Sequence, residues 1–150
     1  MNDLKKKLHS LCVDYVQNRI DAATYAINAA QQAANEETKS SAGDKYETGR
    51  AMMQQETGRN MIQLNEAKKL MVALDQISYN STHITSETGS LVATNDGKFY
   101  IAISAGTLTV DGETFFAVSP ASPIGLKLKG LKSGDGFSLN NKVYEVKSVD

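Results

Sequence analysis

The distribution of proline and glycine divides this sequence into two parts of different character. No proline occurs before Pro120 and the first glycine is Gly43, whereas eight of the eleven glycines lie from Gly89 onward. Both residues interrupt helices, and glycine is the usual residue where a turn requires positive φ. The first part of the chain therefore favours long helices, and the last part favours strands joined by tight turns.

Apolar and small residues recur at three- and four-residue intervals on both sides of a break at residues 39–43. This spacing is typical of helices with one buried face. Each helix would hold roughly 33 to 36 residues and be about 50 Å long, and it needs a partner for its apolar face. We therefore expect an antiparallel two-helix coiled-coil hairpin over residues 1–78, with its tip at 39–47. The positions expected to be buried are Leu4, Leu8, Leu11, Tyr15, Ala22, Tyr25 and Ala29, then Val16, Ile20, Ala23, Ile27 and Ala30, and after the break Met53, Met61, Leu64, Ala67, Met71, Leu74 and Ile77.

The last part of the chain alternates short strand-like runs with turn signals. Asn95-Asp96-Gly97 and Asp111-Gly112 each separate two such runs and predict two hairpins. Two further runs, Phe137 to Leu139 and Val143 to Val149, flank Asn140-Asn141, and the chain is expected to end in a strand. Ser122 before Pro123 is typical of a helix start, so a short helix is expected between strands. The expected fold class is α+β, and residues 79–150 are expected to form a sheet domain that folds by itself.

Composition excludes several classes of function. Sixteen basic and seventeen acidic residues leave a net charge of −1, so no stable binding to DNA is expected. Cys12 is the only cysteine, and its apolar neighbours favour a buried thiol over a nucleophile. His9 and His83 lack the spacing of metal ligands. No run of about 18 apolar residues occurs, so we expect a cytoplasmic protein without a membrane span.

Two short motifs stand out, one in each part of the chain. Gly43-Asp44-Lys45-Tyr46-Glu47 follows the helical break, and a Ser-Pro segment over 119–135 leads through a short apolar helix to Gly130 and to Gly134-Asp135. In order, spacing and total length they resemble the GreA/GreB family of bacterial transcription elongation factors. The resemblance covers essentially the whole chain.

The resemblance implies a fold and a function. The hairpin would enter the secondary channel of RNA polymerase, and an antiparallel sheet domain of FK506-binding-protein (FKBP) type, with one short helix, would dock at the channel rim. Asp44 and Glu47 would help to hold a Mg²⁺ ion in the polymerase active centre, which then cleaves the displaced 3′ end of a backtracked RNA. The chain would have no catalysis of its own and bind no cofactor tightly, because the Mg²⁺ is shared with the polymerase. Carboxylate oxygens suit that ion.

Further residues are candidates for contacts because of their chemistry and their positions. Tyr46 is a candidate contact at the tip, and Arg50 and Arg59 are candidate contacts to RNA or polymerase. The docking domain would use Ser119, Pro120, Pro123, Lys127 and Lys129.

Simpler readings remain open beside these roles. Asp44 and Glu47 also fit a capping box, which is compatible with metal binding. Lys127, Lys129 and Lys132 also fit a solvated face, as do Lys5, Lys6 and Lys7.

Two alternative functions stay open. Lys45 lies between the two acids, and Thr48, Gly49, Arg50 and Ala51 depart from the family pattern of Asn, Ala, Glu and Tyr. A cation there weakens attraction for Mg²⁺, so a secondary-channel regulator that inhibits or modulates polymerase without cleavage is one alternative. A coiled-coil adaptor or chaperone-like module outside transcription is the other.

Overall fold

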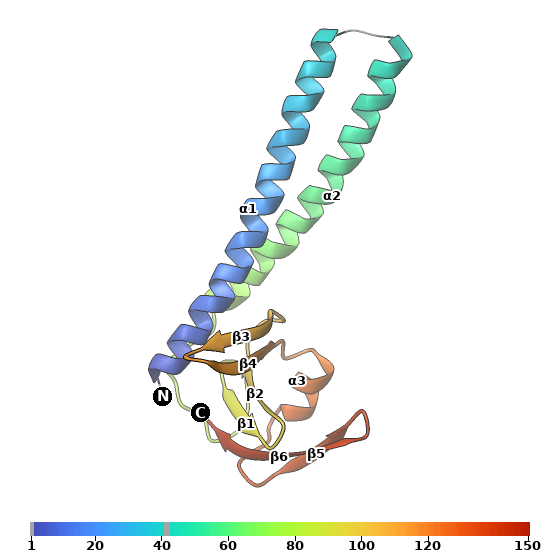
Figure 1. Cartoon of the computed structure of the whole chain (residues 1–150). Coiled ribbons are helices and arrows are strands. Elements are labelled where there is room, and N and C mark those ends of the chain that lie inside the picture. Colours follow the sequence, from blue (N-terminus) through green and yellow to red (C-terminus); the bar gives the residue numbers. More distant parts are fainter. Residues whose placement is uncertain (1, 41–42) are drawn as a thin grey trace. The chain divides into compact units, whose positions relative to one another are not determined.

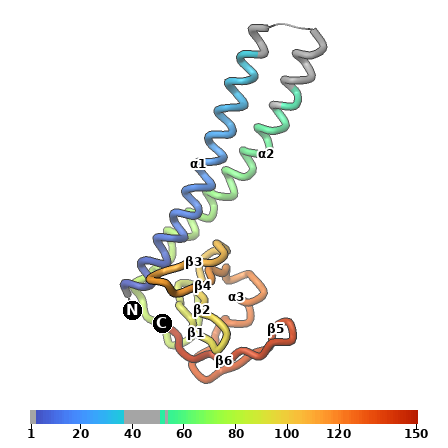
Figure 2. The backbone as a smooth tube through the Cα atoms, viewed as in Figure 1, coloured from blue at the N-terminus to red at the C-terminus, as the bar shows by residue number. Residues whose placement is uncertain are grey.

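The structure, a computed structural model, describes the backbone of residues 2–40 and 43–150 and the side chains of 3–36, 51, 52 and 54–150 (Figure 2). Contacts divide the chain into two compact units. Val16–Met71 forms the hairpin unit, and Met1–Tyr15 together with Val72–Asp150 forms the sheet unit. This division differs from the expected boundary at residue 79, because the beginning of the first helix and the end of the second belong with the strands.

Two helices make up the first part of the chain, as expected. Helix α1 spans Asn2–Ser40 and helix α2 spans Gly43–Asp75 (Figure 1). They run antiparallel within the hairpin unit, where Arg19 lies beside Gln63 in one hollow and Ala34 lies beside Gln54 in another. The expected helical hairpin is confirmed. Over the described residues, neither helix is both long enough and apolar enough to cross a membrane.

Burial in the hairpin unit is narrower than expected. Val16 is fully buried and Ala23 is 7% exposed, whereas Tyr25 is 77% exposed and Met61 is 51% exposed. The expectation of burial is therefore wrong for Tyr25 and Met61, and also for Tyr15, Ala22 and Ala29, which are exposed. Met53 lies outside the described side chains. In a pair of helices, each helix buries only the narrow face that meets its partner. Apolar residues on any other face of the helix therefore remain in solvent.

The sheet unit holds six strands in the order β3-β4-β2-β1-β6-β5 (Figure 1). Asp111 and Gly112 have φ of 51° and 79°, which confirms the tight turn expected there. Asn140 and Asn141, with φ of 54° and 65°, form a further tight turn between β5 and β6. The elements are β1 (Leu91–Thr94), β2 (Gly97–Ile101), β3 (Gly106–Val110), β4 (Glu113–Val118), α3 (Pro123–Leu128), β5 (Gly136–Leu139) and β6 (Lys142–Val149).

One strand pair departs from the expected antiparallel sheet. Strands β2 and β4 pair in parallel, with Phe99 opposite Phe116, while β3 pairs with the outer side of β4. Strand β4 is apolar on both faces, which suits a position between two neighbours, and β3 alternates exposed threonines with buried Leu108 and Val110. The more apolar strand, β4, therefore takes the inner position beside β2. Because it runs parallel to β2 there, the sheet is mixed.

The two faces of the sheet are covered by different helices. On one face, called the Phe99 face, Val92, Phe99 and Ile101 cluster with Val146 and with Leu128 of α3. The opposite face carries Tyr100 and is called the Tyr100 face. There the Tyr100 hydroxyl is hydrogen-bonded to Nδ1 of His9 on α1 at 3.0 Å. The first turns of α1 thus form one layer of the sheet unit.

Lys5 belongs to this buried side of α1, against the expectation that it is solvated. Its side chain is 0% exposed, and it lies on the same helix face as Leu8, His9 and Cys12, all of which are buried. Residues three, four and seven positions apart share a helix face. The expectation is wrong for Lys5 because its place on the buried face of α1, rather than its charge, decides its burial.

Cys12 is predicted to be chemically inert in the folded chain. Burial raises the pKa of its thiol from 9.0 to about 12, which lowers the thiolate fraction at pH 8 by roughly a thousandfold. A thiol-reactive dye at pH 8 should therefore label Cys12 rapidly in urea and hardly at all in buffer. Comparable labelling rates in both conditions would contradict the burial of Cys12.

Candidate docking groove and hairpin tip

The Ser-Pro segment folds into a compact turn that caps α3. The Ser119 carbonyl accepts hydrogen bonds from the Ser122 backbone N–H at 3.1 Å and from the Ser122 hydroxyl at 2.7 Å. The Ser122 hydroxyl in turn accepts from the N–H of Gly125 at 3.1 Å, and Pro123 is the first helical residue. Ser122 is therefore the N-cap that the sequence predicts.

Gly125 allows this turn to lie directly against α3. A Cβ atom at Gly125 would stand 2.1 Å from the Ser119 carbonyl oxygen and 3.0 Å from the Pro120 carbonyl oxygen. No side chain fits at the shorter of these distances, because it is far inside van der Waals contact. The spacing between the Ser-Pro turn and this glycine is thus a packing requirement.

A groove opens beside this turn and is called the docking groove. Its volume is about 350 Å³. Ile101 at its base is 2% exposed, whereas Leu126 on α3 is 63% exposed. The groove is mainly apolar, with one acidic and one basic residue in its lining. The lining residues are Glu87, Thr88, Ile101, Pro120, Ala121, Gly125, Leu126 and Lys129.

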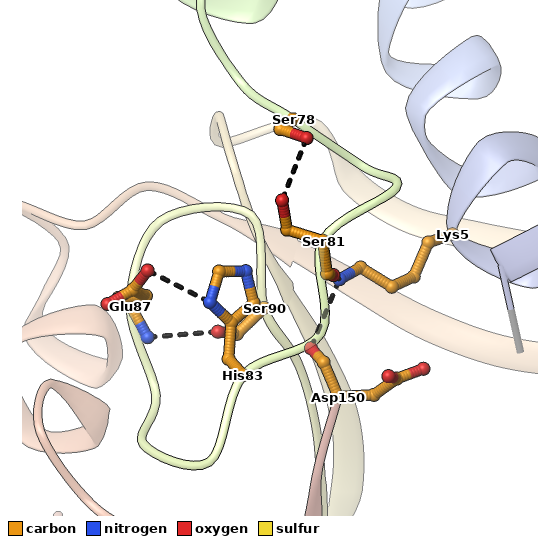
Figure 3. Close-up of polar contacts among 7 residues, drawn as sticks. All are labelled: Lys5, Ser78, Ser81, His83, Glu87, Ser90 and Asp150. Atoms are coloured by element: carbon orange, nitrogen blue, oxygen red, sulfur yellow. Dashed lines mark hydrogen bonds and ion pairs between the residues drawn. The ribbon is translucent and has the colours of Figure 1, made fainter.

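One wall of the docking groove is fixed by local hydrogen bonds. The Glu87 carboxylate lies 2.9 Å from Nδ1 of His83, and the Glu87 N–H donates to the Ser90 hydroxyl at 3.0 Å (Figure 3). The N–H of Gly89 donates to the Ile101 carbonyl at 2.7 Å. This wall comes from the connection between α2 and β1.

The sequence-predicted docking residues are only partly brought together. Pro120 and Lys129 line the groove, and Ser119 shapes the turn behind it. Pro123 and Lys127 are exposed and do not line it.

Six of the eight lining residues were not predicted as docking residues from the sequence. They are Glu87, Thr88, Ile101, Ala121, Gly125 and Leu126. The sequence does indicate Leu126, because it is an apolar residue beside a lysine in a helix of two turns. It does not indicate Glu87 and Thr88, because their positions depend on the path of the segment between α2 and β1.

The candidate residues at the hairpin tip fall mostly outside the described side chains. Asp44, Tyr46, Glu47 and Arg50 lie in the first turns of α2, and their side chains are not among the described ones. Their roles stay predictions. Arg59 is described: it is 71% exposed and its guanidinium lies 3.4 Å from the Glu56 carboxylate.

No metal site is found among the described residues. They contain no group of three or more His, Cys, Asp or Glu side chains that could hold a metal ion. Asp44 and Glu47 lie outside that search, so the search does not bear on the predicted shared Mg²⁺.

Comparisons with known proteins give little for this chain. No model of a protein family matches the chain, and no curated protein matches it by sequence. Among solved structures, the "Structure of the transcription factor Gfh1" is similar, with 18% sequence identity, 91% of each chain covered and a TM-score of 0.36. A similarity of that degree assigns no function to this chain.

Two glycine substitutions should have opposite effects on stability. Gly125→Ala should cost at least about 2 kcal/mol, because the new methyl group overlaps the Ser119 carbonyl. Gly58→Ala is the matched control, since nothing lies within 4 Å of its Cβ position, and it should gain up to about 1 kcal/mol of helix stability. Urea unfolding, followed by amide signals of each unit separately, measures both changes. A Gly125→Ala protein as stable as the unsubstituted chain would show that the turn does not pack as described.

Proposed function

We propose that this chain is a transcription elongation factor of the GreA/GreB type that binds bacterial RNA polymerase in the cytoplasm. The observation that carries the proposal is the placement of its two motifs. Gly43-Asp44-Lys45-Tyr46-Glu47 begins α2 directly after the break between the two long helices. The Ser-Pro segment is packed against α3 around Gly125 and borders an apolar groove.

The hairpin would deliver carboxylates into the secondary channel of the polymerase. Asp44 and Glu47 are three residues apart at the start of a helix, so both lie on nearly the same helix face. Two hard oxygen ligands there could share a Mg²⁺ ion with the polymerase. In a two-metal mechanism, one ion activates the attacking water and the other stabilises the leaving oxygen.

The polymerase would perform the cleavage and the chain would supply ligands. In this proposal the chain is not an enzyme and holds no cofactor of its own. Its contact with the RNA 3′ end occurs only inside the polymerase. Tyr46, Arg50 and Arg59 would contact the channel or the RNA beside the tip, and Arg59 would exchange its bond to Glu56 for such a contact.

The docking groove would hold the sheet unit at the channel rim. Its apolar base suits one or two apolar side chains of the polymerase, and Leu126 would be the main exposed contact. Lys129 and Lys127 are exposed cations at or beside the groove and would add electrostatic attraction to an acidic surface.

A second function is favoured by Lys45. Its ammonium group follows Asp44 directly and opposes the attraction of the two acids for Mg²⁺. A factor with the same fold and docking surface would then occupy the channel and inhibit or modulate transcription without cleavage. The two functions share the partner and differ in what the tip does.

Removing the tip charges separates the two functions. The doubly substituted Asp44→Asn, Glu47→Gln chain keeps both capping side chains, so its stability should change by less than about 1 kcal/mol. Amides are poor Mg²⁺ ligands, so stimulated RNA cleavage in a stalled, backtracked elongation complex should fall by at least about a hundredfold while polymerase binding persists.

The outcomes of this experiment are distinct. Equal cleavage with both chains would show that the carboxylates do not hold the metal. If neither chain stimulates cleavage but both compete for the channel, the inhibitory function takes the place of the cleavage function.

A further inference from the structure

The connection between α2 and β1 has few fixed points in its first half. Residues 78–88, called the strap, contain no helix or strand, and Ile84 within them is 86% exposed. The Ser78 hydroxyl bonds only within the strap, to the Ser81 hydroxyl at 3.0 Å. Holding the strap in one path therefore depends on contacts from elsewhere in the sheet unit.

Two residues of α1 supply the contacts on one side. The buried Lys5 ammonium donates to the Ser81 carbonyl at 2.6 Å and to the main-chain oxygen of Asp150 at 3.2 Å (Figure 3). One turn further along α1, the His9 ring lies 5.0 Å from the Tyr79 ring. The bond from Lys5 ties residues 78–84, all of them described, to another segment of the chain.

The other end of the strap is bonded to the segment after α3. The Ser86 N–H donates to the Leu131 carbonyl at 2.7 Å, and the Gly130 N–H donates to the Ser86 carbonyl at 2.9 Å. Thr85 forms an isolated bridge with Lys132. Beyond these bonds the strap continues into Glu87 and Thr88, which line the docking groove.

The residue that accepts from Lys5 is hydrogen-bonded to the sheet. The N–H and carbonyl of Asp150 both bond to Leu91 of β1, each at 2.9 Å. Burial lowers the pKa of Lys5, and the negative charge of Asp150 opposes that change. A buried ammonium group needs such partners. Lys5 therefore joins the strap to a residue that is bonded to β1 of the sheet.

The closed arrangement leaves polar atoms unsatisfied. Among the described residues, three buried side-chain atoms have no hydrogen-bond partner: His83 Nε2, Ser86 Oγ and Asp150 Oδ2. Two of them lie in the strap, and the third belongs to the residue that pairs with Lys5. Water that reaches the strap could bond to these atoms.

We propose that the strap is a two-state segment that opens locally, with Lys5 as the residue that locks it closed. Opening would displace Glu87 and Thr88 and remove one wall of the docking groove. If the groove is the docking surface, as proposed above, a partner that binds there stabilises the closed strap. The local opening itself does not depend on that function.

Hydrogen exchange in the full chain tests the lock. The amides of Ser86 and Gly130 report the closed strap, and those of Ala102 and Val146, which bond to Val118 and Asp135, report the sheet. In Lys5→Met, the Ser86 and Gly130 amides should exchange at least about tenfold faster, since a bond from a charged donor is lost, while the sheet amides stay unchanged. Lys6→Met is the control, because Lys6 is an exposed neighbour on α1, and it should exchange as the unsubstituted chain does.

Two results would overturn the proposal. One is unchanged exchange at Ser86 and Gly130 in Lys5→Met, and the other is faster exchange spread evenly over the sheet. If Lys5→Met does not fold, exchange of the unsubstituted chain in low urea decides the question. The Ser86 and Gly130 amides must then open with a lower free energy than Ala102, and opening only with global unfolding refutes the strap. Neither measurement contains polymerase, so failure of the proposed function would leave both results unaffected.

Discussion

The packing of the first turns of α1 against the Tyr100 face is the contact on which the rest of the sheet unit depends. Lys5, Leu8, His9 and Cys12 present one buried side, which meets Tyr100 of β2 through a hydrogen bond and the end of β6 through Lys5. A half-covered sheet of this size would expose its second apolar face to water. The beginning of the chain therefore completes the core that its last strands begin.

Local signals in the sequence predicted the elements well. Gly43 marks the start of α2, Ser122 caps α3, and Asp111-Gly112 takes the positive φ values that a tight turn requires. The parallel pairing of β2 with β4 and the burial of Lys5 were not predicted. Both depend on which distant segments meet, and neither strand pattern nor side-chain charge contains that information.

The candidate site shows the same division between local and distant determinants. The Ser-Pro turn and Gly125 belong together for a local reason. A Cβ atom at position 125 would lie 2.1 Å from the Ser119 carbonyl oxygen, so the turn requires glycine at this distance along the chain. The opposite wall of the docking groove comes from the strap, whose path is set by Lys5, some 76 positions earlier in the chain than Ser81. A motif can thus indicate a docking surface without showing all the residues that form it.

Binding of the full chain to bacterial core RNA polymerase, compared between two charge substitutions, tests the central claim most directly. Leu126→Glu places a charge in the apolar docking groove, whereas Val143→Glu changes a side chain that is 70% exposed and lies outside the groove. The account predicts that the unsubstituted chain and Val143→Glu bind alike and that Leu126→Glu binds at least about tenfold more weakly. No binding by the unsubstituted chain, or equal binding by all three, would contradict it.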